Sequence, residues 1–161
     1  MKTLTYLLFA GIFSLVTGTA SAGDWQSSYS GLIQKYVRGS GVDTKKWHGN
    51  SADMTKMAAV VASIADESPS GTKNQRLAWY INAYNALSLH QMLSGGSGRS
   101  HIVSGQRMSL HDLEYKLIRS FFKDPRVPYA LNGGNSASLR VYNARSLNSD
   151  LSAQAEKFGK R

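Results

Sequence analysis

The chain has no cysteine among its 161 residues. Disulfide bonds, thiol nucleophiles and cysteine metal ligands are therefore excluded, and so is a small scaffold held together by disulfides. The folded state has to be stabilised by packed apolar side chains instead. The four histidines, His48, His90, His101 and His111, form no pair at a metal-ligand spacing. We therefore expect no metal and no cofactor.

Familiar catalytic and phosphate-binding motifs are missing as well. Serine is abundant, but no Gly-x-Ser-x-Gly elbow is present to expose one as a nucleophile. The glycine-rich stretch 95–98 follows a predicted helix, whereas a phosphate loop places its glycines ahead of a helix N-terminus. We interpret this stretch as a helix end and a linker.

Long apolar runs are absent except at the N-terminus. A single cation, Lys2, precedes the uncharged run Leu4–Val16, and the small residues Ala20 and Ala22 follow it. These are the three parts of a secretory signal. The alternative is a membrane anchor, which needs about 20 apolar residues. The run is shorter than that, so we predict a signal peptide over residues 1–22, cleaved after Ala22, and export to the periplasm or the cell exterior.

Acidic residues are few, because 10 Asp and Glu stand against 19 Lys and Arg, a formal net charge of +9. Such a charge attracts anionic surfaces at long range. No dense basic cluster or nucleic-acid motif is present, which argues against nucleic acid as the partner. For an exported chain, the charge favours anionic lipid or polysaccharide of the envelope. We expect no transmembrane segment in the mature chain.

The remaining residues, 23–161, predict a single domain that is mainly α with a small β element (α+β). Apolar side chains recur every three or four residues over most of its length, which is typical of amphipathic helices. Helices are expected over residues 24–38, 52–65, 73–93, from Ser109 to a stop at Asp124-Pro125, and from Leu147 to Phe158. Short strands are expected at 101–103, 127–131 and 139–142, and a polar connector at 42–51.

The helix over residues 73–93 has the clearest sequence signals. Thr72 and Gln75 form a capping-box pattern at its start. Its middle, Leu77–Leu87, is apolar on nearly every side, which is typical of a helix at the centre of a core. Two asparagines, Asn82 and Asn85, lie about 60° apart on this helix. They either bind backbone groups and lock the core, or line a polar pocket.

A carboxylate in an apolar setting is the other candidate functional group. Glu114 has mostly apolar neighbours one turn away, so it needs a cation or amide donors. Arg126, just after the helix, would suit this role, and Arg119 is less well aimed. The pair is either structural or, if the site is open, Glu114 has a raised pKa and acts as an acid or base.

The stretch Leu77–Leu87, Leu-Ala-Trp-Tyr-Ile-Asn-Ala-Tyr-Asn-Ala-Leu, resembles the signature helix of the bacterial family called domain of unknown function 547. Further blocks resemble the family pattern in the same order. They are Ser109–Glu114, Asp124–Arg126, Tyr129–Asn132 and Leu139–Tyr142. The resemblance covers about residues 25–158, nearly all of the predicted mature chain.

This chain departs from the family pattern where the family carries histidine or cysteine. Tyr115 and Pro128 stand where histidines are usual, and Gly133 and Ala137 fall about where cysteines are common. The resemblance therefore implies no Cys/His chemistry here, and no evident nucleophile remains. The polar residues that survive form a candidate pocket: Asn82, Asn85, Glu114, Arg126 and Asn132.

Three functions stay open at this point. The first is an exported, non-catalytic binding or interaction domain of unknown biochemical role. The second is a hydrolase-like enzyme, active or decayed, in which Glu114 serves as acid or base. The third is a basic binder of anionic lipid or polysaccharide at the envelope surface. An exposed Glu114 beside Asn82 and Asn85 would favour the enzyme, whereas a buried and paired Glu114 would favour the binding domain.

Overall fold

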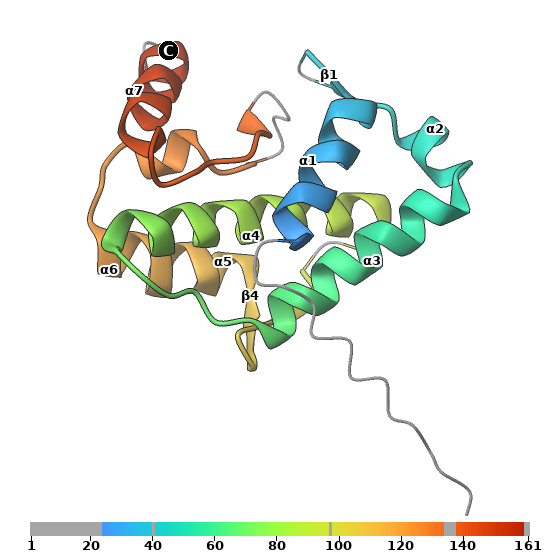
Figure 1. The fold of residues 1–161 in the computed structure, drawn as a ribbon, viewed down its shortest axis with the longest axis horizontal. Coiled ribbons are helices and arrows are strands. Elements are labelled where there is room, and N and C mark those ends of the chain that lie inside the picture. The colour runs from blue at the N-terminus through green and yellow to red at the C-terminus, as the bar shows by residue number, and fades with distance from the viewer. Residues whose placement is uncertain (1–23, 40, 97, 134–137, 160–161) are drawn as a thin grey trace, which may run out of the picture.

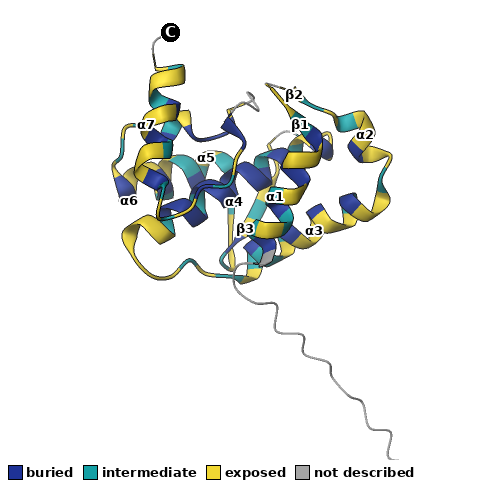
Figure 2. Cartoon of the chain, turned by 45° about the horizontal axis from the view of Figure 1, so that its top comes forward, coloured by how far each residue is buried: buried dark blue, intermediate teal, exposed yellow. Residues whose placement is uncertain are grey.

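Helix α4 (Lys73–Leu93) lies at the centre of the fold (Figure 1). The computed structural model describes residues 24–39, 41–96, 98–133 and 138–159, so the predicted signal peptide and Ala137 lie outside the described residues. From Leu77 to Leu87 only Tyr80 is not buried (Figure 2). The capping box at Thr72 and Gln75 is present. The prediction of a central, capped helix is therefore confirmed.

The N-terminal part packs three helices around one end of α4. The stripe that predicted the first helix, from Trp25 to Tyr36, is buried against the core. The buried carboxylate of Asp53 joins the first and third helices, because it accepts a hydrogen bond from Tyr36 and pairs with Lys35 at 2.5 Å. The elements are α1 (Asp24–Tyr36), a hairpin of β1 (Val37–Arg38) and β2 (Gly41–Val42), α2 (Thr44–His48) and α3 (Ser51–Asp66).

These elements differ from the sequence prediction in two places. The first helix, expected over residues 24–38, ends at Tyr36, and Val37–Arg38 is the strand β1. The stretch 42–51 was expected to be a polar connector, but Asp43 caps a short helix there by accepting a hydrogen bond from the amide of Lys46. That helix buries Trp47, whose ring stacks on Tyr36 with centroids 4.4 Å apart. The connector prediction was wrong because one buried aromatic ring is enough to dock a single helical turn.

The expected strand near His101 is part of a hairpin. Strand β3 (Ser100–Val103) pairs antiparallel with β4 (Gln106–Ser109) through a two-residue turn. Both turn residues, Ser104 and Gly105, have positive φ, as a tight hairpin requires. Their amides donate to the carbonyls of Ile64 and Ala65, so the turn caps the C-terminus of α3.

A second helical rod runs antiparallel to α4. It begins at Leu110, with Ser109 as its N-cap, and consists of α5 (Leu110–Asp112), the π-helix η1 (Leu113–Arg119) and α6 (Ser120–Phe122). Residue pairs that meet between the two helices run in opposite directions: Tyr84 meets Glu114, and Tyr80 meets Phe122. We call this contact the α4–η1 seam.

The described residues of the C-terminal part form no strand. The strands expected at 127–131 and 139–142 were wrong: Val127–Tyr129 is a 3₁₀ turn, η2, and 139–142 is irregular. Pro128 has no N–H for a ladder. In the rest of this segment, side chains of α4 form hydrogen bonds with backbone groups that a neighbouring strand would otherwise bind. The chain then ends in α7 (Leu147–Phe158), as predicted.

The expected fold class, mainly α with a small β element, is confirmed, although the β element is two short hairpins rather than the strands expected after residue 126. Within the described part of the chain, none of the helices combines the length and the apolar character needed to cross a bilayer.

Candidate functional site

Asn82 binds a backbone peptide of the C-terminal segment. Its side chain is fully buried, donates to the carbonyl of Tyr142 at 2.8 Å and accepts from the amide of Tyr142 at 2.8 Å. The same Nδ2 also donates to Gln26 of α1 at 3.2 Å. A primary amide can pair with a peptide group in this way because it carries one acceptor and a two-proton donor. Asn82 therefore joins α1, α4 and the C-terminal segment.

Asn85 repeats this arrangement one turn later. It donates to the carbonyl of Ala130 at 3.0 Å and accepts from the amide of Asn132 at 2.8 Å. Ser88, three residues further on, donates to the carbonyl of Asn132 at 3.1 Å and accepts from its Nδ2 at 3.2 Å. Asn82, Asn85 and Ser88 thus form one polar stripe at a spacing of three, which holds Ala130, Asn132 and Tyr142 against α4.

Glu114, on η1, lies against a different side of α4 from the side that carries Asn82 and Asn85. Its side chain is 17% exposed and pairs with Arg119 at 3.4 Å. Tyr84 donates to its other oxygen at 3.5 Å, the long limit of a hydrogen bond. Of the two arginines that the sequence offered, Arg119 is therefore the partner. Tyr84, rather than the two asparagines, is the residue of α4 that meets this carboxylate.

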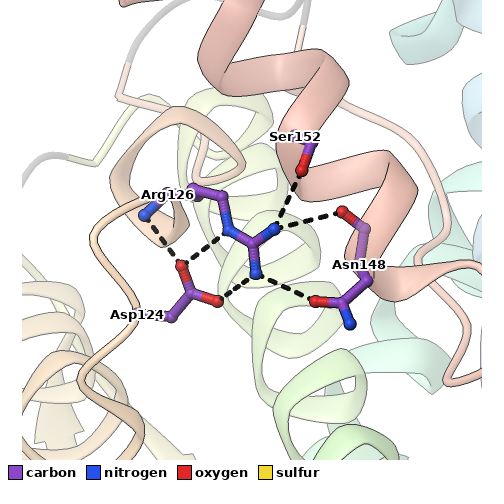
Figure 3. Close-up of polar contacts among 4 residues, drawn as sticks. All are labelled: Asp124, Arg126, Asn148 and Ser152. Atoms are coloured by element: carbon purple, nitrogen blue, oxygen red, sulfur yellow. Dashed lines mark hydrogen bonds and ion pairs between the residues drawn. The ribbon is translucent and has the colours of Figure 1, made fainter.

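Arg126 is held near α7, where it is engaged by three side chains (Figure 3). It pairs with both oxygens of Asp124, at 3.0 Å through Nε and at 2.7 Å through Nη2. Its Nη groups also donate to the carbonyl and side chain of Asn148 and to Ser152. All five guanidinium N–H groups are thus used. Arg126 fastens the Asp-Pro-Arg turn to α7 and has no donor left for a ligand.

The sequence-based set is therefore divided by the fold. Asn82 and Asn85 belong to the stripe that fixes the C-terminal segment, and Asn132 belongs to that segment. Glu114 lies across the seam, and Arg126 binds α7. Asn132 lines a groove on the surface at the C-terminal half of α4, together with Tyr84, the residue that contacts Glu114.

This groove has a volume of about 490 Å³ and is lined by uncharged residues. We call it the neutral groove. Its lining consists of Tyr84, Ser88, Gln91 and Met92 of α4, Gly95 and Gly96 after it, Leu110 of α5, and Asn132 and Gly133. Asn132 is only 2% exposed, and its Oδ1 is buried with no hydrogen-bond partner. A buried acceptor without a donor costs about 1–3 kcal/mol, so a donor that reached this atom would be stabilised.

The titratable and nucleophilic groups around the groove are held in unreactive states. Burial, and then the nearby Glu114 carboxylate, raise the pKa of Tyr84 to about 12, so its phenol stays a hydrogen-bond donor at neutral pH. The Ser88 hydroxyl donates to a backbone carbonyl instead of a base. His101 contacts Gln91 at 3.3 Å, and burial lowers its pKa, which keeps it neutral. The groove can therefore bind by hydrogen bonding but has no activated nucleophile.

Three polar lining residues were missed by sequence reasoning: Tyr84, Ser88 and Gln91. Ser88 could have been found, because it continues the spacing of Asn82 and Asn85. Gln91 continues the same spacing by three more residues, whereas Tyr84 carries no such signal, since only the packing of the second rod shows which face of α4 remains accessible. Among the described residues, no group of three or more His, Asp or Glu side chains is placed to hold a metal ion.

Comparison with known proteins gives one match. The family described as "Protein of unknown function, DUF547" matches residues 69–158. No curated protein and no solved structure matches the chain. The resemblance noted from the sequence is thus confirmed from residue 69 onward, and its extension back to residue 25 stays a prediction. The matched region contains every residue that lines the neutral groove.

Proposed function

The chain belongs to the DUF547 family, and we propose that it is an exported, non-catalytic binding domain that holds a neutral, hydroxyl-rich saccharide in the neutral groove. The observation that carries this proposal is the contrast in charge between the whole chain and the groove. The chain has a net charge of +9, whereas none of the residues lining the groove is charged. A ligand that needed ionic contacts would not be matched here.

The polar groups of the groove favour a ligand that both donates and accepts hydrogen bonds. Asn132 Oδ1 needs a donor, and the Gln91 amide carries both kinds of group. A sugar hydroxyl can fill both roles. Met92 and Leu110 add apolar surface on which the C–H face of a sugar ring can rest. Export, inferred from the signal pattern of residues 1–22, would bring the chain to the polysaccharides of the cell envelope.

The pairing of Glu114 supports binding over catalysis. Its two oxygens are engaged by Arg119 and Tyr84, and the asparagines that would have shaped a catalytic pocket hold backbone groups instead. The carboxylate is therefore occupied on the seam and does not line the groove. A general acid or base has to reach the reacting atom within hydrogen-bond distance.

The test is calorimetric titration of the exported chain with a neutral N-acetylated tetrasaccharide, chitotetraose. Binding is expected, and Asn132→Ala should weaken it by about tenfold, because removing one hydrogen bond costs about 1 kcal/mol or more. The matched control is Asn74→Ala, which makes the same change at an exposed position in the first turn of α4. If Asn132→Ala unfolds, Gln91→Ala replaces it, because Gln91 lines the groove and, among the described residues, its side chain has a hydrogen bond only with His101.

Two results would overturn the proposal. One is an Asn74→Ala variant that loses as much affinity as the groove variants, since binding would then lie elsewhere. The other is cleavage of the saccharide during the titration, detected by mass spectrometry and abolished by Glu114→Gln. That result would make the second functional hypothesis, the hydrolase-like enzyme, correct.

A further inference from the structure

A second pocket lies at the other end of the α4–η1 seam. It has a volume of about 470 Å³ and is lined by Arg76, Tyr80, Lys116, Leu117, Ser120, Phe121 and Phe122. We call it the cationic pocket. It differs from the neutral groove in its two cations and three aromatic rings, and it contributes no residue to the proposed saccharide site. A role for this pocket is therefore independent of the saccharide proposal.

The cations of this pocket are only weakly neutralised. Lys116 pairs with Asp112 at 2.8 Å, but its side chain is 76% exposed, and exposed pairs of this kind contribute little. Arg76 donates to the carbonyl of Gly71 at 3.4 Å and lies over the ring of Phe121, with no carboxylate partner among the described residues. Both cations are therefore available to an anion.

Phe121 is the second notable feature. Its side chain is 64% exposed, more than any other large apolar side chain in the described part of the chain. The ring contacts Phe122 edge-on at 5.1 Å and lies 5.9 Å from the Arg76 guanidinium carbon. An exposed aromatic ring in a pocket with cations is the arrangement that favours the interface of an anionic bilayer, where the ring enters the acyl boundary and the cations meet phosphates.

We infer that the α6 end of the molecule docks on a membrane surface rich in anionic phospholipid, with Phe121 inserted and with Arg76 and Lys116 on headgroup phosphates. A free phosphate would use the cations but would leave the Phe121 ring in water. A nucleic acid would need a longer track of cations than this pocket contains. The lipid surface is the occupant that uses both the charge and the exposed ring.

The test uses flotation of the exported chain with vesicles of phosphatidylcholine, either pure or with about one third phosphatidylglycerol. Binding is expected only to the anionic vesicles. The double variant Arg76→Gln/Lys116→Gln should bind about 20-fold more weakly, because each cation near such a surface contributes about a fivefold factor. The matched control is Lys45→Gln/Lys46→Gln, which removes the same charge from α2, at the opposite end of the molecule (Figure 1).

A second variant measures the insertion of residue 121 into the bilayer, even if the charge variant folds poorly. Phe121→Trp should be quenched by brominated lipid in anionic vesicles, whereas Ile102→Trp, at another exposed apolar position on β3, should not. The inference fails if both charge variants lose affinity equally, if pure phosphatidylcholine binds as well, or if the Phe121→Trp side chain is not quenched. It also fails if duplex DNA displaces the vesicles from the chain, whereas inorganic phosphate at the same ionic strength is expected to leave them bound.

Discussion

The two ends of the α4–η1 seam share the same two helices but differ in chemistry. At one end, Tyr84 and Ser88 of α4 face an uncharged groove, and at the other end Arg76 and Tyr80 face a cationic pocket. These four residues are spaced by four along α4, so one stripe of a single helix supplies both sites. The difference lies in what covers the stripe: the C-terminal segment at the neutral end and the aromatic residues of α6 at the cationic end.

This contrast shows how one helix can be a core element and a surface for two ligands. The face of α4 that carries Asn82 and Asn85 is occupied by backbone groups of Ala130, Asn132 and Tyr142. The stripe with Arg76 and Tyr84 is only partly covered by the second rod, and a pocket lies at each of its ends. Substitutions along these contacts test whether the two ends behave independently.

The largest effect is expected for Asn85→Leu. The substitution leaves the carbonyl of Ala130 and the amide of Asn132 buried without partners, at a combined cost of about 2–4 kcal/mol in the free energy of unfolding. Urea denaturation measures this loss. The neutral groove should open while vesicle binding at the cationic end persists. Asn74→Leu, at an exposed position, is the control, and an Asn85→Leu variant as stable as this control would contradict the placement.

A smaller effect is expected at the turn that connects the two ends. Hydrogen bonds from Arg126 hold the pKa of Asp124 below its usual value of 3.8. The Asp124 carboxyl therefore binds a proton more readily in the unfolded chain than in the folded one. The stability that this pair contributes is present above pH 3.8 and is lost as pH falls below it. At pH 6, Asp124→Asn should cost about 1–2 kcal/mol, and the loss should shrink in acid. Urea titrations at several pH values measure it, with Asp66→Asn, at the end of α3, as control; a loss independent of pH would refute the linkage.

The smallest effect is expected at the contact between Tyr84 and Glu114 in the seam. Tyr84→Phe removes a long hydrogen bond to Glu114, which keeps Arg119, so the free energy of unfolding should fall by about 1 kcal/mol or less. Thermal melting by circular dichroism is sensitive enough. Tyr115→Phe is the matched change at an exposed tyrosine on the same rod. A loss above about 3 kcal/mol would mean that Tyr84 and Glu114 are a central core contact rather than a peripheral one.

Much of the secondary structure could be predicted because it depends on local signals. The bounds of α4 followed from the capping box and the apolar stretch, and α3 and α7 followed from apolar spacing. The strands predicted within 127–142 were wrong, because the apolar and β-branched residues there are typical of strands. The backbone groups of this segment are bound by Asn82 and Asn85 from α4, and no local pattern indicates a partner that lies about 45 to 60 residues away.

The candidate site was predictable only in part, for the same reason. The burial of Asn82 and Asn85 followed from the helix they occupy, and the need of Glu114 for a cation followed from its apolar neighbours. Which cation it is, and which residue of α4 meets it, depends on how the second rod lies across the seam. The exposure of Phe121 was not predictable, because spacing alone does not separate a buried position in an apolar stripe from one at the edge of a contact.

By itself, the sequence determined the helical class, the central position of α4, the absence of thiol chemistry and the excess of positive charge. These are properties of composition and of local periodicity, which survive any arrangement of the helices. Only the tertiary structure decided that the asparagines bind backbone, that Arg126 is fully engaged, and that one seam ends in a neutral groove and a cationic pocket. Each of these depends on contacts between residues far apart in the chain, and their partners are chosen by packing.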